Sequence, residues 1–333
     1  MVIAEGFLLV FVAGTIIGGN LLPMKWMKAW KWENFWLVYS LVSLVIVPFG
    51  LAFFLIPHLG RVYASIPLHS MALPFLYGVA WGIAQLGAGI CVHGIGLGLT
   101  GSILNGICAA TGTFIPLCLQ HSEMLLRRSG LLIIAGTLVM AVGLTLCGRA
   151  GNAREHATGQ LKSTGSGYWG ILVLAVISGV LAALLNIALA FGGNIMAAAR
   201  EAGAAQAWAP FAVWPIALAG GFLTNLAYCI YKLSRNKTWG NFSANPREIM
   251  NPVLGGAVWM IAIAIYSSAT TFLGVLGVSV GWALFQILTI LSGNLAGVLT
   301  GEWRQMEARI SRLFQMGVAI LFLALALIGA ANY

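Results

Sequence analysis

The placement of charge along the chain is the feature that most limits what it can fold into. The chain contains no Asp, and its eight acidic residues are all Glu that lie at or near the ends of long apolar runs. The 17 Lys and Arg are confined to short connectors in the same way. The apolar runs hold about 20 residues each, the length that a helix needs to cross a hydrocarbon core of about 30 Å. Because a charged side chain at that depth costs a free energy of about 3 kcal/mol or more, the pattern predicts a protein that crosses a membrane many times.

The composition excludes several other classes of protein. Charged residues make up 8% of the chain, against about 25% in soluble proteins. The net charge of +9 does not indicate nucleic-acid binding, because the basic residues flank helix ends and suit an anionic membrane leaflet. The five Cys form no CxxC pair, so we expect no metal site, and no cofactor is indicated. An interior almost without formal charge suits a neutral polar cargo better than an ion.

Ten apolar segments are long enough to cross the membrane, and because only helices or closed barrels satisfy the backbone in lipid, we expect helices. The expected fold is therefore an all-α integral membrane protein with spans at 3–23, 34–56, 72–91, 94–119, 129–147, 168–192, 207–232, 252–271, 274–299 and 311–331. Thirteen of the 17 basic residues fall in the connectors after the odd-numbered spans or within two residues of them. The positive-inside rule then predicts that these connectors are cytoplasmic and that both termini lie outside.

The two halves of the chain share short matches in the same order. We expect a first five-helix repeat at 1–147, a linker at 148–167 and a second repeat at 168–333. The matches are 32–35 (Trp-Glu-Asn-Phe) with 239–242 (Trp-Gly-Asn-Phe), 78–81 (Gly-Val-Ala-Trp) with 256–259 (Gly-Ala-Val-Trp), 97–100 (Leu-Gly-Leu-Thr) with 276–279 (Leu-Gly-Val-Ser), and Glu123 with Glu302. An odd number of helices inserts the second copy upside down. Inverted repeats are typical of alternating-access carriers, which bind their cargo near the midplane.

Several segments resemble one known family. They are 23–25 (Pro-Met-Lys) with 28–33 (Lys-Ala-Trp-Lys-Trp-Glu), 81–85 (Trp-Gly-Ile-Ala-Gln), the glycine-rich run 95–116, and 301–303 (Gly-Glu-Trp). These segments resemble the bacterial L-rhamnose–proton symporters, which have Asn where this chain has Gln85. The resemblance implies the ten-helix fold of the drug/metabolite transporter superfamily, proton-coupled sugar uptake and a place in the bacterial inner membrane.

Aromatic and amide side chains within the spans are the candidates for binding a neutral sugar. Tyr77, Trp81 and Gln85 share one helix face, Trp214 and Asn225 share another, and Trp282 and Gln286 a third; Asn105, Asn186 and Tyr266 complete the set. An aromatic ring would cover the apolar face of a sugar, and amides would bind its hydroxyls. The alternative is that each of these residues makes a buried contact between helices. Small residues at every fourth position, such as 94, 98, 102, 106 and 110, are expected to let helices pack closely.

A proton relay within a membrane normally uses an acid or His. The candidates for proton coupling lie near the ends of spans: Glu5 in the first turn, His93 in the turn between the third and fourth spans, and Lys25 beside Pro23. Each is equally explained as a solvated anchor.

The sequence thus favours a secondary transporter that takes up a neutral deoxysugar such as L-rhamnose with protons. The alternative on the same fold is a proton-independent facilitator, or an exporter of another small neutral metabolite. An enzyme is not expected, because no paired carboxylates or His cluster lies at membrane depth. A channel is disfavoured because no ring of charge interrupts the helices.

Overall fold

The computed structural model describes residues 2–159, 168–274, 276–301, 303–304 and 306–331, and these are helical with no strand among them. The longer helices are α1 (Val2–Ile17), α2 (Trp32–Leu41), α3 (Val47–Leu55), α5 (Leu68–Ile95), α6 (Leu97–Gln120), α7 (Arg128–Ala157), α8 (Tyr168–Ala190), α9 (Gly193–Glu201), α10 (Trp214–Asn236), α12 (Met250–Phe272), α13 (Gly277–Leu299) and α14 (Ala308–Ala330). Shorter turns are η1 (Leu22–Trp26), η2 (Val42–Ile46), α4 (Leu59–Ser65), η3 (Ser122–Met124), η4 (Ala209–Ala212), α11 (Asn241–Ala244) and η5 (Pro246–Ile249).

Ten of the described helical segments are long and apolar enough to cross a membrane, which confirms the number of spans expected from hydropathy. The largest difference concerns α7, which continues to Ala157 and so takes in the first ten residues of the expected linker. The rest of that linker, 160–167, lies outside the described residues. The seventh span begins at Trp214 rather than at 207, because Pro210 and the 3-10 turn η4 occupy the residues before it.

The second span changes from α-helix to π-helix and back about halfway along. It consists of α2, a π-helical turn at Val42–Ile46 and α3. Pro48 follows the π turn and has no N–H to donate to a carbonyl one turn earlier, which is a common cause of such a local change. The π turn places Ser43 and Leu44 beside a pocket described below.

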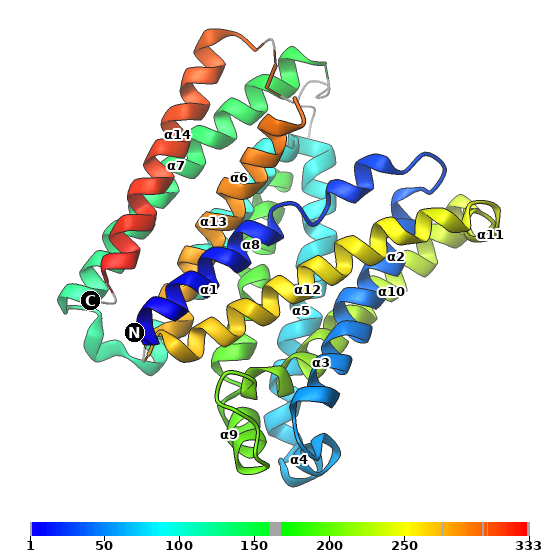
Figure 1. The fold of residues 1–333 in the computed structure, drawn as a ribbon. Helices are drawn as coiled ribbons and strands as arrows, with labels where there is room; N and C mark the ends of the chain where they lie inside the picture. The colour runs from blue at the N-terminus through cyan, green and yellow to red at the C-terminus, as the bar shows by residue number, and fades with distance from the viewer. Residues whose placement is uncertain (1, 160–167, 275, 302, 305, 332–333) are drawn as a thin grey trace.

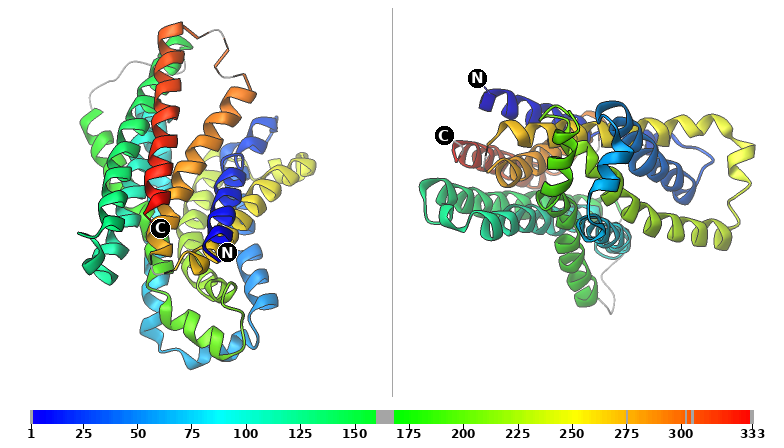
Figure 2. Two further views of the ribbon diagram at one scale, coloured as in Figure 1. Left: turned by 60° about the vertical axis from the view of Figure 1, so that its left-hand side comes forward. Right: turned by 90° about the horizontal axis from the view of Figure 1, so that it is seen from below.

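The helices of the two halves pack in corresponding ways. The helix α5 of the expected first half packs on α8 and α10 of the expected second half. Conversely, α12 of the second half packs on α1 and α2 of the first. Likewise α6 contacts α7 and α8, while α13 contacts α14 and α1. Three further contacts join corresponding helices directly: α7 with α14, α6 with α13, and α2 with α10. Figure 2 shows α14 running alongside α7.

Glycine permits the closest of these contacts. A side chain on Gly78 of α5 would collide with the backbone of Ala217 in α10. A Cβ on Gly256 of α12 would lie 2.8 Å from the carbonyl oxygen of Tyr39 in α2. Close packing at a small residue is therefore present at the first residue of each matched segment, 78–81 and 256–259.

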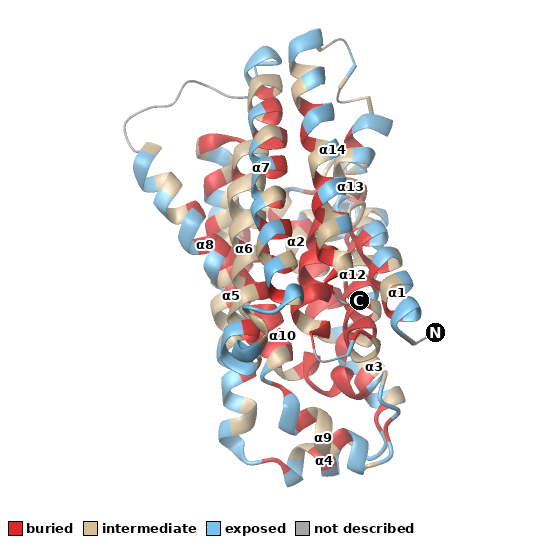
Figure 3. Cartoon of the chain, turned by 90° about the vertical axis from the view of Figure 1, so that its left-hand side faces the viewer, coloured by how far each residue is buried: buried red, intermediate tan, exposed pale blue. Residues whose placement is uncertain are grey.

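The two ends of the bundle differ. In Figure 1 the α7–α14 side and the α10–α12 side diverge towards the end that carries α11, which we call the upper end. The lower end carries both termini, α4 and α9. There α4 packs on α9, α9 packs on η4, and the Tyr63 hydroxyl donates a hydrogen bond to the carbonyl of Ala212 at 2.9 Å. Buried residues gather where helices face one another (Figure 3).

Candidate functional site

A cavity of about 350 Å³ lies among the upper ends of α1, α6, α7 and α13. We call it the upper cavity; its lining includes Leu21, Gly98, Asn105, Cys147, Arg154 and Asn294. Leu21 and Leu97 at its rim are exposed. Asn105 lies eight residues beyond Leu97 on α6, about 12 Å further along the helix. The cavity therefore reaches from the upper end well into the span, and its volume is in the range of ligand pockets.

A second pocket of about 120 Å³ lies between α2, α5, α10 and α12. We call it the aromatic pocket; its lining includes Trp36, Tyr39, Trp81, Gln85, Asn225 and Trp259. Leu21 lines both spaces, so the aromatic pocket adjoins the upper cavity at the end of α1. The pocket brings together three of the predicted site residues, Trp81, Gln85 and Asn225.

Two tryptophans face each other across this pocket. The rings of Trp81 in α5 and Trp259 in α12 have centroids 5.7 Å apart. They are the last residues of the 78–81 and 256–259 match, so two residues that the sequence match pairs lie in contact here. Neither indole N–H makes a hydrogen bond within the described chain, which leaves both available to a ligand.

The amides of the pocket differ in their bonding. Asn225 accepts a hydrogen bond from the indole of Trp36 at 2.6 Å and donates to the carbonyl of Gly221 at 2.8 Å. Asn20 donates to the hydroxyl of Tyr39 at 2.6 Å. The amide of Gln85 is partly buried and makes no hydrogen bond with the described residues. A polar group held in an aromatic pocket without a partner is suited to bind a hydroxyl of a small ligand.

Sequence reasoning missed Trp36, Tyr39 and Trp259. On α2, Trp36 stacks on Trp32 at 5.3 Å and on Tyr39 at 5.1 Å. Two signals were available: the spacing of these aromatic residues on one helix face, and the position of Trp259 as the counterpart of Trp81.

Five other predicted site residues form a buried network in the lower half of the bundle, which we call the lower network: Asn186, Trp214, Tyr266, Trp282 and Gln286. The Tyr266 hydroxyl donates to Asn186 Oδ1 at 2.6 Å, and Asn186 Nδ2 donates to the carbonyl of Gly112 at 2.9 Å. The indole of Trp214 donates to Ser267 at 3.1 Å. These residues line neither of the two cavities.

Two members of the lower network meet α6. The indole of Trp282 donates to the carbonyl of Cys108 at 3.2 Å, and the Gln286 amide lies 3.6 Å from the Cys108 sulfur. The rings of Tyr266 and Trp282 pack at 5.6 Å. In the described conformation Trp282 and Gln286 therefore make buried contacts between α13 and α6.

The remaining candidates are scattered. Asn105 lines the upper cavity, whereas Tyr77 packs against the core and lines neither cavity. Glu5 is exposed at the start of α1, at the lower end. His93 is exposed in the last turn of α5 rather than in a turn between spans, and its Nδ1 lies 2.8 Å from the carbonyl of Gly89. The side chain of Lys25 lies outside the described residues.

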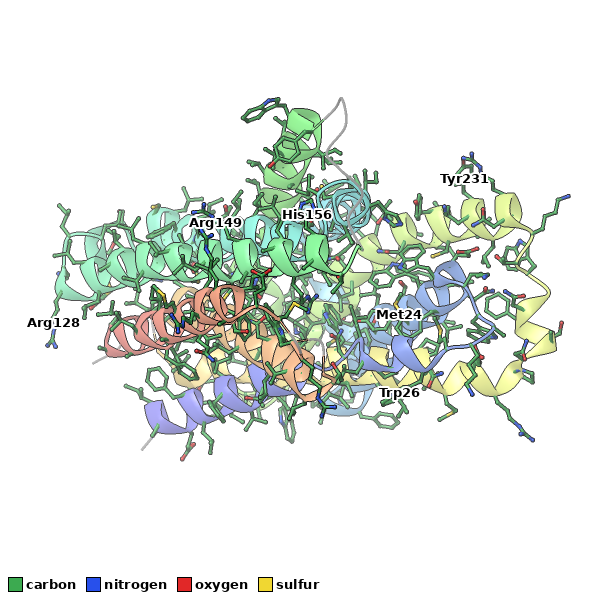
Figure 4. The ribbon with its side chains drawn as sticks, turned by 90° about the horizontal axis from the view of Figure 1, so that it is seen from above. Met24, Trp26, Arg128, Arg149, His156 and Tyr231 are labelled. Atoms are coloured by element: carbon green, nitrogen blue, oxygen red, sulfur yellow. The ribbon has the colours of Figure 1, made fainter. Side chains whose placement is uncertain are left out.

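Two basic connectors are joined at the upper end. The carboxylate of Glu248 accepts hydrogen bonds from the backbone N–H groups of Lys28, Ala29 and Trp30, at 2.8–3.3 Å. Asn241 donates to Asn34 Oδ1 at 3.1 Å. Figure 4 views this end from above, with Met24 and Trp26 on the segment that leads from α1 towards α2.

This contact corrects one of the sequence matches. Residues 32–35 begin the second span, whereas 239–242 follow the seventh, so the two do not hold corresponding places in five-helix halves. The two segments instead contact each other, through Asn241 and Asn34. In the match of Glu123 with Glu302, Glu302 lies outside the described residues.

The mouth of the upper cavity carries a cation over an aromatic ring. The guanidinium of Arg154 lies 5.1 Å from the ring centroid of Trp303, which stacks on Phe314 at 3.9 Å. Trp303 belongs to the 301–303 segment on which the family resemblance partly rests. Within the described residues, no three His, Cys or acidic side chains are placed to hold a metal ion.

Ten candidate spans that enclose a cavity and an adjoining aromatic pocket fit the class of multi-pass membrane transporters. Comparison with known proteins gives the family. The model of the L-rhamnose-proton symport protein family matches residues 2–332, so the chain belongs to that family.

Curated relatives of similar length carry the same description. An L-rhamnose-proton symporter of Escherichia coli O1:K1 / APEC is 27% identical over 316 residues, which is 92% of each chain. One of Shigella boydii serotype 18 is also 27% identical over 316 residues and 92% of each chain. One of Escherichia coli strain SMS-3-5 / SECEC is 26% identical over the same share. The family is one of symporters and not of enzymes.

Proposed function

We propose that this chain takes up a neutral deoxysugar such as L-rhamnose together with protons. The observation that carries the proposal is the aromatic pocket. The facing rings of Trp81 and Trp259 suit the apolar face of a sugar, and the unpaired amide of Gln85 suits its hydroxyls. The printed names of the relatives supply the sugar and the coupling ion.

Transport would proceed by alternating access between two inverted halves, 1–147 and 168–333, on the drug/metabolite transporter fold. The corresponding packing of α5 on α8 and α10 and of α12 on α1 and α2 supports this division. So does the meeting of Trp81 with Trp259, because corresponding residues near an in-plane two-fold axis lie close together.

The upper end would face the cytoplasm of a bacterium, with the chain in the inner membrane and both termini in the periplasm. The support is the concentration of basic residues in the upper connectors. The described conformation would then be open inward, since the upper cavity reaches from that end and the lower end is packed.

Binding of sugars to the purified protein tests the proposal. L-Rhamnose is expected to quench or shift the fluorescence of the pocket tryptophans in a saturable way, and its mirror image D-rhamnose and the hexose D-glucose are expected to bind more weakly. In proteoliposomes, an inward proton gradient should drive accumulation of L-rhamnose above its external concentration. Uptake that ignores the gradient would favour a facilitator, and no binding of any sugar in a panel would reject the assigned cargo.

A further inference from the structure

We infer that Glu155, near the end of α7, is the side chain that binds the transported proton; this inference rests on the proposed proton-coupled function. Glu155 is only 3% exposed, although α7 ends two residues later, at Ala157. Its Oε1 accepts a hydrogen bond from the backbone N–H of Gly98 at 2.9 Å. Its Oε2 is also buried and has no hydrogen-bond partner in the described chain.

The two carboxyl oxygens give the group two accessible charge states. When Glu155 is ionised, Oε1 receives an N–H from the first turn of α6, and the positive end of that 24-residue helix stabilises the charge. The buried Oε2 then lacks a donor, which is costly. A proton on Oε2 removes the formal charge, and the Gly98 hydrogen bond remains. The geometry thus offers a partner to either charge state, as a proton-binding site requires.

No acid lies within α6, α13 or α14, the long helices packed against α7. Neither α6 nor α13 contains Asp, Glu, Lys, Arg or His, and the two thiols of α6 lie ten or more residues beyond Gly98. The acid Glu123 on η3 lies at the other end of α7. The other titratable groups towards this end are Cys147, Arg149, Arg154 and His156 on α7, His93 at the end of α5, Arg309 and Arg312 at the start of α14, and the exposed Glu307 that precedes that helix. Figure 4 shows Arg149 and His156 along α7.

Glu155 is linked to the upper cavity through its hydrogen-bond donor. Gly98, which donates to the carboxyl, lines that cavity, and so does Gly151, one turn before Glu155 on α7. A Cβ on Gly98 would lie 2.8 Å from the Cα of Gly151, so α6 and α7 touch here without side chains between them. A small movement of the start of α6 away from α7 would both break the Gly98 hydrogen bond and admit cavity water to the carboxyl. Proton binding and helix movement are linked at one contact.

Exchange and accumulation measured in proteoliposomes test this assignment. Glu155→Gln keeps an acceptor for Gly98 and mimics the protonated acid. Sugar exchange at equal concentrations on both sides should persist, whereas accumulation driven by a proton gradient should be lost. Glu201→Gln is the matched control, because Glu201 is an exposed acid at the end of α9 at the lower end, and it should accumulate sugar as the wild type does.

The outcomes separate this inference from the function on which it rests. If the wild type exchanges sugar but never accumulates it with a proton gradient, the coupled function is wrong. If the wild type accumulates sugar and Glu155→Gln does so equally, Glu155 is not the proton site. Loss of accumulation in Glu5→Gln or His93→Ala, with Glu155→Gln normal, would move the site to one of those residues.

A measurement on the wild type covers the case in which Glu155→Gln does not fold. An apolar carbodiimide adds to protonated carboxyl groups, and mass spectrometry of the digested protein locates the adduct. Labelling of Glu155 should be strong at acidic pH, fall as pH rises, and change when L-rhamnose is present. Absence of the adduct at every pH, with adducts at exposed Glu201 as the positive control, would overturn the assignment.

Discussion

The aromatic pocket and the lower network are built from the same kinds of residue, yet they differ in how their polar groups are used. In the lower network, Asn186 engages both ends of its amide, one with Tyr266 and the other with Gly112. In the aromatic pocket, Gln85 has no partner and the two facing indoles keep their N–H groups. A tryptophan with an amide on one helix face therefore predicts a polar contact, and only the unpaired groups distinguish a binding site from packing.

The same contrast separates the two ends of the transport path. At the lower end Tyr63 is bonded to Ala212, and the first residues of the seventh span are buried. At the upper end the rim of the upper cavity exposes Leu21 and Leu97. Under the proposed function, the paired region would seal the lower end in this conformation, and the unpaired region would be the space that a ligand enters.

The largest expected effect is the loss of the seal. Trp214 is 1% exposed and donates to Ser267, so Trp214→Ala removes a filled volume and leaves that hydroxyl without its donor. The free energy of unfolding should fall by about 3–5 kcal/mol. Thermal unfolding of the purified protein in detergent measures this. Sugar affinity of the folded fraction should be nearly unchanged, and a specific loss of affinity without loss of stability would place Trp214 in the binding site.

Trp81→Ala should have the next largest effect, on binding. Truncation of a buried aromatic anchor costs about 2 kcal/mol or more, which is roughly a thirtyfold loss of affinity. Titration of L-rhamnose against the folded variant measures it. Trp169→Ala is the control, because Trp169 is 78% exposed and lines neither cavity. Near-normal affinity in the Trp81 variant would show that α5 does not contribute to the site.

Gln85→Ala should have a smaller effect that is confined to binding. The amide makes no hydrogen bond that folding would lose, so the unfolding temperature should stay within error of the wild type. Loss of a hydrogen bond to the sugar should cost about 1 kcal/mol, or roughly fivefold in affinity. Asn186→Ala is the comparison variant from the lower network. It should lower the unfolding temperature and leave the affinity for L-rhamnose unchanged. The comparison between the two regions fails if these two variants behave alike.

Single Cys substitutions on the surface, the smallest perturbation, test which end of the bundle faces the cytoplasm. In a Cys118→Ser background, a Cys introduced at the exposed Asn245 lies at the upper end, and one at the exposed Ala64 lies at the lower end. A thiol reagent that cannot cross the membrane should label Ala64→Cys from outside the cell and leave Asn245→Cys unlabelled. The reverse result would make the upper cavity open outward.

Hydropathy was sufficient for the ten spans, because a charged residue within lipid is costly whatever its neighbours are. It failed at the end of α7, where Arg149, Arg154 and Glu155 resemble a connector by composition. The charges of Arg154 and Glu155 are accommodated by tertiary contacts, with the indole of Trp303 and the backbone of Gly98 respectively, which lie about 50 or more residues away in sequence. The composition of a local segment does not predict such long-range partners.

The candidate site was predicted in part. Trp81, Gln85 and Asn225 meet as an amide–aromatic site requires, but Asn186, Tyr266 and Trp282 have the same residue types and pair with one another. Helical spacing gives the face on which a side chain lies. It does not give the hydrogen-bond partner, which comes from a helix elsewhere in the chain.

The pairing of Trp81 with Trp259 has a consequence for the orientation of a bound sugar. Two facing indoles offer similar surfaces from either side, whereas a sugar ring presents unlike faces. A sugar between them could therefore bind either way round if nothing made the two sides different. The residue 178 positions after Gln85, at the same place relative to its tryptophan, is Ile263, which is 3% exposed. One side of the pair offers an amide where the other offers only hydrocarbon, and that inequality would favour one orientation.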